Sequence, residues 1–192
     1  MATRIEIGLR RGVRDSRGRG VAARAKRFLH LAVRSCETRD VYRIDTALTP
    51  AEVERVRAAF TDPVTSVSAT GRLAPPAFDW LIEVGFKPGV TDNVGRTART
   101  VVHDVLRREL GPYEEVYTAT QYFLSGALDR TAAERLAVQL LANPLIQTTR
   151  VFAPAEWTAA PVDESVPAIH DRTEPQTLTY DLDGSDEDLL RI

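Results

Sequence analysis

Alternating apolar and polar residues open two separate stretches of the chain. Residues 5–9 read IEIGL and residues 82–86 read IEVGF. A period of two is that of a β-strand with one buried face. After each stretch come a turn and then apolar residues at helical spacing, at Val21, Ala25, Phe28 and Leu29 and again at Ala98, Val102, Val105 and Leu106. The pattern therefore predicts the order strand, turn, helix twice.

The two stretches are copies of one module. Residues 5–29 and 82–106 share a glycine, acid and arginine pattern at an offset of 77, and the similarity continues at an offset of 80 or 81. In both copies a second segment rich in β-branched and aromatic residues follows, then a second helix, then Asp62-Pro63 or Asn143-Pro144 before a last strand. We predict a β-α-β-α-β order for each copy.

The predicted fold class is α+β, in two layers, with two helices on one face of a small antiparallel sheet in each module. The first module spans residues 1–67, a linker with Gly71 and Pro75-Pro76 spans 68–80, and the second module spans 81–152. A unit of about seventy residues buries only roughly 60% of its unfolded surface. We therefore expect the open sheet faces to meet in a covalent pseudo-twofold dimer with the helices outside.

Residues 153–192 form an acidic, proline-containing tail. Its first part is predicted to be an extended linker, and residues 185–190 resemble the start of a helix.

Ten residues at matching positions are the candidate structural and interface residues. They are Gly8, Gly12, Asp15, Gly18 and Arg19 in the first copy and Gly85, Gly89, Asp92, Gly95 and Arg96 in the second. The first pair of glycines suggests a bulge or the close approach of another backbone. The second pair supplies turns, and the aspartates are placed to cap helices. Glycine in a first helical turn costs about 1 kcal/mol relative to alanine, so the third pair predicts close packing rather than phosphate binding.

The sequence contains no motif for catalysis, a metal or a cofactor, so we expect the chain itself to be non-catalytic. Its one cysteine, Cys36, is interpreted as a small, partly buried thiol. The three histidines, His30, His103 and His170, lack the spacing of a metal site or a catalytic dyad. A phosphate-binding loop followed by lysine is also missing from the sequence.

Charge is distributed unevenly along a chain whose net charge is only −2. Residues 1–27 are strongly basic and the residues from Asp163 onward are acidic. A solvated helix face with an acidic tail accounts for this, and docking of a partner or a phosphate-bearing ligand is the functional alternative. The sequence has neither a run of about eighteen apolar residues nor a secretory signal, so we expect a cytoplasmic protein without a membrane segment.

With the module defined, the chain resembles the PurS subunit of phosphoribosylformylglycinamidine synthase. Because the module is duplicated, it is also similar to the PurS-like N-terminal region of the long single-chain forms. The resemblance covers about residues 4–152 and rests on GVRD at 12–15, PGVTD at 88–92, the Gly18 and Gly95 positions, and LLAN at 140–143.

This resemblance implies a non-catalytic part that bridges an ATP-dependent, PurL-type synthetase and a PurQ-type glutaminase. That assembly converts formylglycinamide ribonucleotide, glutamine and ATP into formylglycinamidine ribonucleotide, glutamate, ADP and phosphate in purine biosynthesis. ATP and Mg²⁺ are then expected in the synthetase and not in this chain. The tail is similar to the connector that leads into the synthetase region, so the chain is either a separate subunit or the front of a longer polypeptide.

Two other classes of function fit parts of the sequence. A tandem sensor domain would bind an amino acid or a nucleotide at the seam between the copies, with Gly12 and Gly89 lining the site. An RNA-binding protein would use the basic start and the strand with Tyr122 and Phe123. Adjacent strand residues face opposite sides, however, so these two rings cannot form one stacking platform.

Overall fold

The computed structural model describes residues 2–167, and each copy of the repeat in it forms three strands and two helices. The first copy contributes β1 (Thr3–Leu9), α1 (Ser16–Leu29), β2 (Val33–Asp45), α2 (Pro50–Phe60) and β3 (Ser66–Thr70). The second contributes β4 (Trp80–Phe86), α3 (Asn93–Leu106), β5 (Glu115–Gly126), α4 (Arg130–Leu136) with its π-helical continuation η1 (Ala137–Leu141), and β6 (Gln147–Phe152). The predicted element order is therefore confirmed in both copies.

Strand pairing follows the sequence repeat residue by residue. Ile5 pairs with Tyr42 in the first copy, and Ile82 pairs with Tyr122 in the second. These are equivalent positions at offsets of 77 and 80. The outer pairs, β1 with β3 and β4 with β6, match in the same way when the last strands are related by an offset of 81. Residues that are equivalent in the sequence repeat therefore occupy equivalent positions in the sheet.

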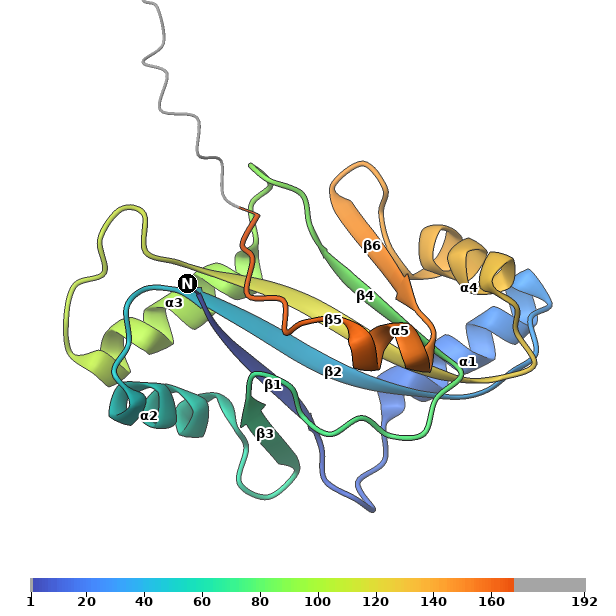
Figure 1. Cartoon of the computed structure of the whole chain (residues 1–192), viewed down its shortest axis with the longest axis horizontal. Helices are drawn as coiled ribbons and strands as arrows, with labels where there is room; N and C mark the ends of the chain where they lie inside the picture. The colour runs from blue at the N-terminus through green and yellow to red at the C-terminus, as the bar shows by residue number, and fades with distance from the viewer. Residues whose placement is uncertain (1, 168–192) are drawn as a thin grey trace, which may run out of the picture.

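All six strands belong to one antiparallel sheet, in the order β3-β1-β2-β5-β4-β6 (Figure 1). The copies meet where β2 pairs with β5, from Val33 opposite Gly126 to Asp45 opposite Glu115. Asp40 pairs with Thr120, its own equivalent at an offset of 80, so the pseudo-twofold axis passes through this pair.

The expectation that two sheet faces would meet is wrong, because the copies join edge to edge. Pairing along the long strands β2 and β5 satisfies the backbone donors and acceptors of both inner edges, which separate sheets would leave open. The α+β class and the antiparallel pairing are confirmed.

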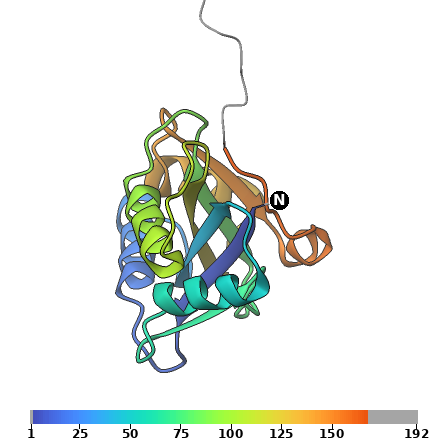
Figure 2. The same cartoon turned by 90° about the vertical axis from the view of Figure 1, so that its left-hand side faces the viewer.

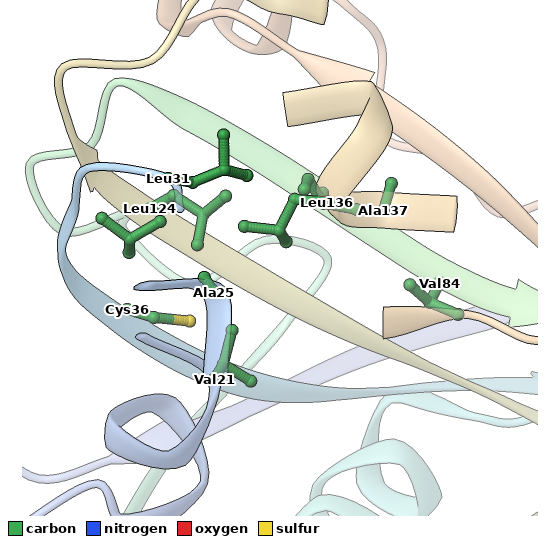
Figure 3. Packing of buried hydrophobic residues seen from close by; sticks show 10 residues of the cluster. Val21, Ala25, Leu31, Cys36, Val84, Leu124, Leu136 and Ala137 are labelled. Atoms are coloured by element: carbon green, nitrogen blue, oxygen red, sulfur yellow. The ribbon is translucent and has the colours of Figure 1, made fainter. Parts of the chain in front are cut away.

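Helices α1 to α4 cover one face of the sheet, and each helix pair combines the two copies. Val21 and Ala25 of α1 pack against Leu136 of α4 and Ala137 of η1 (Figure 3). On the other side of the pseudo-axis, Val56 of α2 packs in one cluster with Ala98, Val102 and Leu106 of α3. Because both apolar cores contain helices of both copies, neither copy buries its core alone.

The connection between the copies is shorter than the predicted linker at 68–80. Strand β3 extends to Thr70 and strand β4 begins at Trp80, so only residues 71–79 connect them.

The segment after β6 is also more structured than predicted. Residues 153–167, which we call the strap, begin with the short helix α5 (Pro154–Ala159) and lie on the face opposite helices α1 to α4 (Figure 2). Trp157 of α5 is buried there against Leu81, Phe123, Phe152 and Phe78. The expectation of an extended linker is therefore wrong for residues 154–159, which form a helix that Trp157 anchors on the sheet. The predicted helix start at 185–190 lies outside the described residues.

Within residues 2–167, none of the helices has the length and apolar character that spanning a membrane requires.

Replacing Leu136 by alanine tests whether helices of the two copies pack against each other. Leu136 is fully buried, so Leu136→Ala is expected to lower the free energy of unfolding by about 2–5 kcal/mol in urea denaturation. Amide hydrogen exchange in α1, a helix of the other copy, should become faster. The control is Val138→Ala, a neighbouring position that is 47% exposed, with an expected loss below about 1 kcal/mol. Unchanged protection of α1 in Leu136→Ala would contradict this packing.

Candidate functional site

Two aspartates at equivalent positions tie the first helix of each copy to a central strand. Asp15 Oδ1 accepts the backbone N–H of Gly18 at 2.7 Å, and its Oδ2 accepts the backbone N–H and the hydroxyl of Thr38 on β2 at 2.6 and 2.9 Å. Asp92 makes the same contacts for α3 and Thr118 on β5. The predicted helix caps are confirmed, and each carboxylate also fixes its helix on the sheet.

The close packing predicted at the helix glycines is present. A Cβ atom on Gly18 would lie 2.0 Å from the carbonyl oxygen of Cys36, and one on Gly95 would lie 2.1 Å from that of Val116. Each helix therefore touches the backbone of a central strand, which only glycine allows.

The remaining shared glycines divide into two cases. Gly12 and Gly89 have φ angles of 90° and 77°, as the predicted turns require. At Gly8 and Gly85 the predicted bulge or backbone approach is not found, because the strands run in register through both positions and the nearest groups are side chains. At Gly8 the nearest atom belongs to Leu73 of the connecting segment, 3.3 Å from the position of a Cβ.

Arg19 and Arg96 are exposed on α1 and α3. Arg96 lines a cavity of about 440 Å³ with Gly89 and Asp92. The equivalent turn of the first copy, with Gly12 and Asp15, lines a cavity of about 460 Å³. Neither cavity lies at the seam between the copies, which is where the sensor interpretation places its ligand.

The face opposite the four helices carries buried charges. Glu6 on β1 and Glu83 on β4 are equivalent at an offset of 77 and are 0% and 2% exposed. Glu6 accepts the Nε and Nη2 of Arg4 at 3.0 and 2.8 Å. Glu83 accepts Arg4 at 2.7 Å and Arg43 at 2.5 Å.

Gln121 lies between the two carboxylates and donates to both, at 3.2 Å to Glu6 and 2.9 Å to Glu83. Arg150 on β6 also donates to Glu83 at 2.5 Å, and Arg39 lies 3.8 Å from Glu6. We call this set the ion network; its members are Arg4, Glu6, Arg39, Arg43, Glu83, Gln121, Arg150 and Asp163.

The strap is fastened to the ion network at Asp163. The carboxylate of Asp163 pairs with Arg43 at 3.3 Å and with Arg150. Its backbone carbonyl accepts hydrogen bonds from Arg4 at 3.1 Å and Arg43 at 3.4 Å. Nearby, the Arg72 guanidinium lies 3.8 Å from the ring centroid of Trp157 and donates to that residue's carbonyl at 2.8 Å.

Arginines and hydrogen bonds together keep these carboxyl groups ionised. Burial alone would raise the pKa of Glu83, but Arg4, Arg43 and Arg150 outweigh burial and hold that pKa well below its usual range. Burial also acts to raise the pKa of Asp163, and hydrogen bonds from Ser165 together with the nearby arginines lower it overall. Both groups are therefore ionised at neutral pH.

The buried glutamates are the residues that the sequence analysis missed. Their signal is present in the repeat, because IEIG and IEVG place the same acid on the polar face of both opening strands. Nothing local to Glu6 or Glu83 shows that arginines from β1, β2 and β6 will surround them.

Exposed apolar side chains mark the two ends of the sheet. Asp62 and Asn143 hold equivalent turns that project Val64 and Leu145, which are 77% and 82% exposed. The turn after the opening strand lies beside each of them, through hydrogen bonds from Arg10 N–H to the Thr65 carbonyl and from Lys87 N–H to the Ile146 carbonyl. Corner 1 is the exposed Leu9, Val13 and Val64. Corner 2 is the exposed Leu145 and Ile146 with the half-buried Phe86 and Val90.

The cysteine and the histidines considered in the sequence analysis have structural positions. Cys36 is buried, and burial, with Asp15 and Glu37 nearby, raises the pKa of its thiol to about 12. His30 ends α1 in a left-handed conformation, as Arg107 does at the equivalent end of α3. His103 is partly exposed, whereas His170 lies outside the described residues. Within residues 2–167 there is no group of three histidine, cysteine, aspartate or glutamate side chains arranged to hold a metal ion.

No model of a known protein family matches the chain, and neither does the sequence of any curated protein.

Alanine at the helix–strand contact tests the role of Gly18. The Cβ atom would overlap the Cys36 carbonyl, so Gly18→Ala should destabilise the protein by more than about 2 kcal/mol in urea denaturation. Gly20 provides the control on the same helix, because its Cβ would meet no atom within 4 Å. Gly20→Ala should be neutral or stabilise by up to about 1 kcal/mol through helix propensity. Equal effects of the two substitutions would contradict the contact.

Acidic pH should reduce the stabilisation that the ion network provides. The pKa values of Glu83 and Asp163 are lowered by folding, so their stabilisation is complete above the ordinary carboxyl pKa of about 4 and is lost as the pH falls below it. The free energy of unfolding should drop between about pH 5 and pH 3, and less steeply in Asp163→Asn. Glu109→Gln, at a side chain that is 99% exposed, is the control and should keep the slope of the unmodified protein. A slope unchanged in Asp163→Asn would refute the assignment.

Proposed function

We propose that the chain is a non-catalytic assembly component of phosphoribosylformylglycinamidine synthase, which links the synthetase to the glutaminase. The proposal rests on the resemblance of the repeated module to PurS. The observation that supports it most directly is the arrangement of the two copies as a covalent pseudo-dimer about the Asp40–Thr120 pair. A rigid body with two similar ends is suited to holding two partners.

The ends are built alike but carry different charge. Corner 1 is bordered by the exposed arginines Arg10, Arg11 and Arg14. Their equivalents at corner 2 are Lys87, Pro88 and Thr91, so only one positive charge remains there. Complementary charge selects partners more than it adds affinity. Corner 1 therefore suits an acidic surface, and corner 2 suits a more neutral one.

The first test is co-purification of the tagged chain with the synthetase and the glutaminase of the source organism, together with an assay of glutamine-dependent activity. Both partners should be retained, and glutamine-dependent turnover should require the chain. Full activity without it would refute the proposal.

Substitutions at the corners then separate the two contacts. Val64→Asp and Leu145→Asp place a charge on highly exposed positions, so folding should be preserved while one partner is lost with each variant. Val162→Asp, at a residue of the strap that is 42% exposed, is the control and should retain both partners. Retention of both partners by both corner variants would exclude the corners as contacts.

A deletion tests docking through the tail. It should remove residues 168–192 only, because residues 153–167 pack on the sheet and their loss would expose the ion network. If affinity for the synthetase is unchanged, the tail does not dock.

A further inference from the structure

A polar cavity of about 220 Å³ lies between the strap and the sheet, where the copies meet. Its charged and hydroxyl-bearing lining residues are Arg43 from the first copy, Glu83, Thr118, Thr148 and Arg150 from the second, and Asp163 and Ser165 from the strap. In Figure 1 the strap (orange to red) runs across the central strands on this side of the sheet.

The two carboxylates in this cavity have their acceptor sites occupied. Glu83 Oε1 accepts Arg43 and Arg150, and its Oε2 accepts Arg4 and Gln121. One Asp163 oxygen pairs with Arg43 and Arg150, and the other accepts the N–H and the hydroxyl of Ser165. A carboxylate has about four lone-pair sites, so neither group has capacity left for a further donor.

Some N–H groups of the arginines that line the cavity remain without a hydrogen-bond acceptor. Each guanidinium carries five N–H bonds. Arg43 uses its Nε and Nη2 and Arg150 uses its Nη2, which leaves Nη1 of both and Nε of Arg150 without a hydrogen bond to residues 2–167. The buried Nε of Arg72, in a neighbouring cavity that Arg150 and Asp163 also line, has no acceptor among these residues either.

The charges show the same imbalance. Five arginines, Arg4, Arg39, Arg43, Arg72 and Arg150, surround three carboxylates, Glu6, Glu83 and Asp163. When the exposed Glu37, which lies near Arg39, is also counted, the arginines still outnumber the carboxylates. Arg4, Arg39 and Arg43 are at most 7% exposed, and each of them pairs with a carboxylate. The excess positive charge therefore falls on Arg72, which is half-buried, and on Arg150, whose side chain is 43% exposed.

We propose that this cavity binds a small oxyanion, either phosphate or the carboxylate of a metabolite of a few carbons. The free N–H groups of Arg43 and Arg150 hold the anionic oxygens, and the Thr148 hydroxyl on the cavity wall is a further donor. The volume is below the usual range for larger ligands, which excludes a nucleotide. The site goes beyond the proposed assembly function and does not depend on it.

Isothermal titration calorimetry on the full chain, in chloride buffer at constant ionic strength, tests this site. Sodium phosphate, sodium sulfate and sodium acetate are the probes, and extra sodium chloride is the control. Saturable binding of at least one oxyanion is expected, and preference for phosphate or for acetate distinguishes the two sources. Arg150→Gln should weaken binding at least tenfold, whereas Arg96→Gln, an exposed arginine outside the network, should not change it.

Two further variants make the result decisive. Asp163→Asn removes a competing negative charge, so it should bind the anion more tightly, which a purely structural ion network would not explain. Thr148→Val keeps the charges and removes one donor, so it should weaken binding even if Arg150→Gln proves unstable. No saturable heat with any oxyanion, or equal affinity in Arg150→Gln and the unmodified chain, would overturn the proposal. Co-purification with the synthetase and glutaminase would be unaffected by that failure.

Discussion

The structure depends on the pairing of β2 with β5. This one antiparallel contact converts two small three-stranded units into a six-stranded sheet and places the pseudo-twofold axis at Asp40 and Thr120. It also brings helices of different copies together over the same face, so that α1 rests on α4 and α2 on α3. A module that is marginal in size thereby shares its core with its copy.

The two faces of the sheet are stabilised by different interactions, apolar packing on one and buried ion pairs on the other. On the helix side, apolar clusters exclude water, and Asp15 and Asp92 fix the helices through hydrogen bonds to central strands. The other side has no comparable helix layer among the described residues, and it buries glutamates and arginines under the connecting segment and the strap. Such pairs contribute less net stability than apolar packing, but losing one partner is expensive, so they favour one arrangement strongly. The strap is positioned by this requirement together with the burial of Trp157.

These two properties support the proposed assembly role. A continuous sheet is rigid and presents equivalent corners at its two ends, with different charge at each. The ion network lies on the face opposite the helices, and the anion cavity borders corner 2 through Phe86. The proposed contact at corner 1 therefore shares no lining residue with the proposed anion site.

The sequence by itself determined the repeat and the elements of both copies, because the period of apolar residues, the capping aspartates and the glycines at Gly18 and Gly95 are local signals that occur twice. It did not determine how the copies join. The apolar periodicity is compatible with both a face-to-face and an edge-to-edge arrangement, and the choice depends on backbone pairing between distant strands. Only the tertiary structure decided that Glu6 and Glu83 would be buried among arginines and that Asp163 would fasten the strap. Those contacts join residues up to 159 positions apart, and no local pattern encodes them.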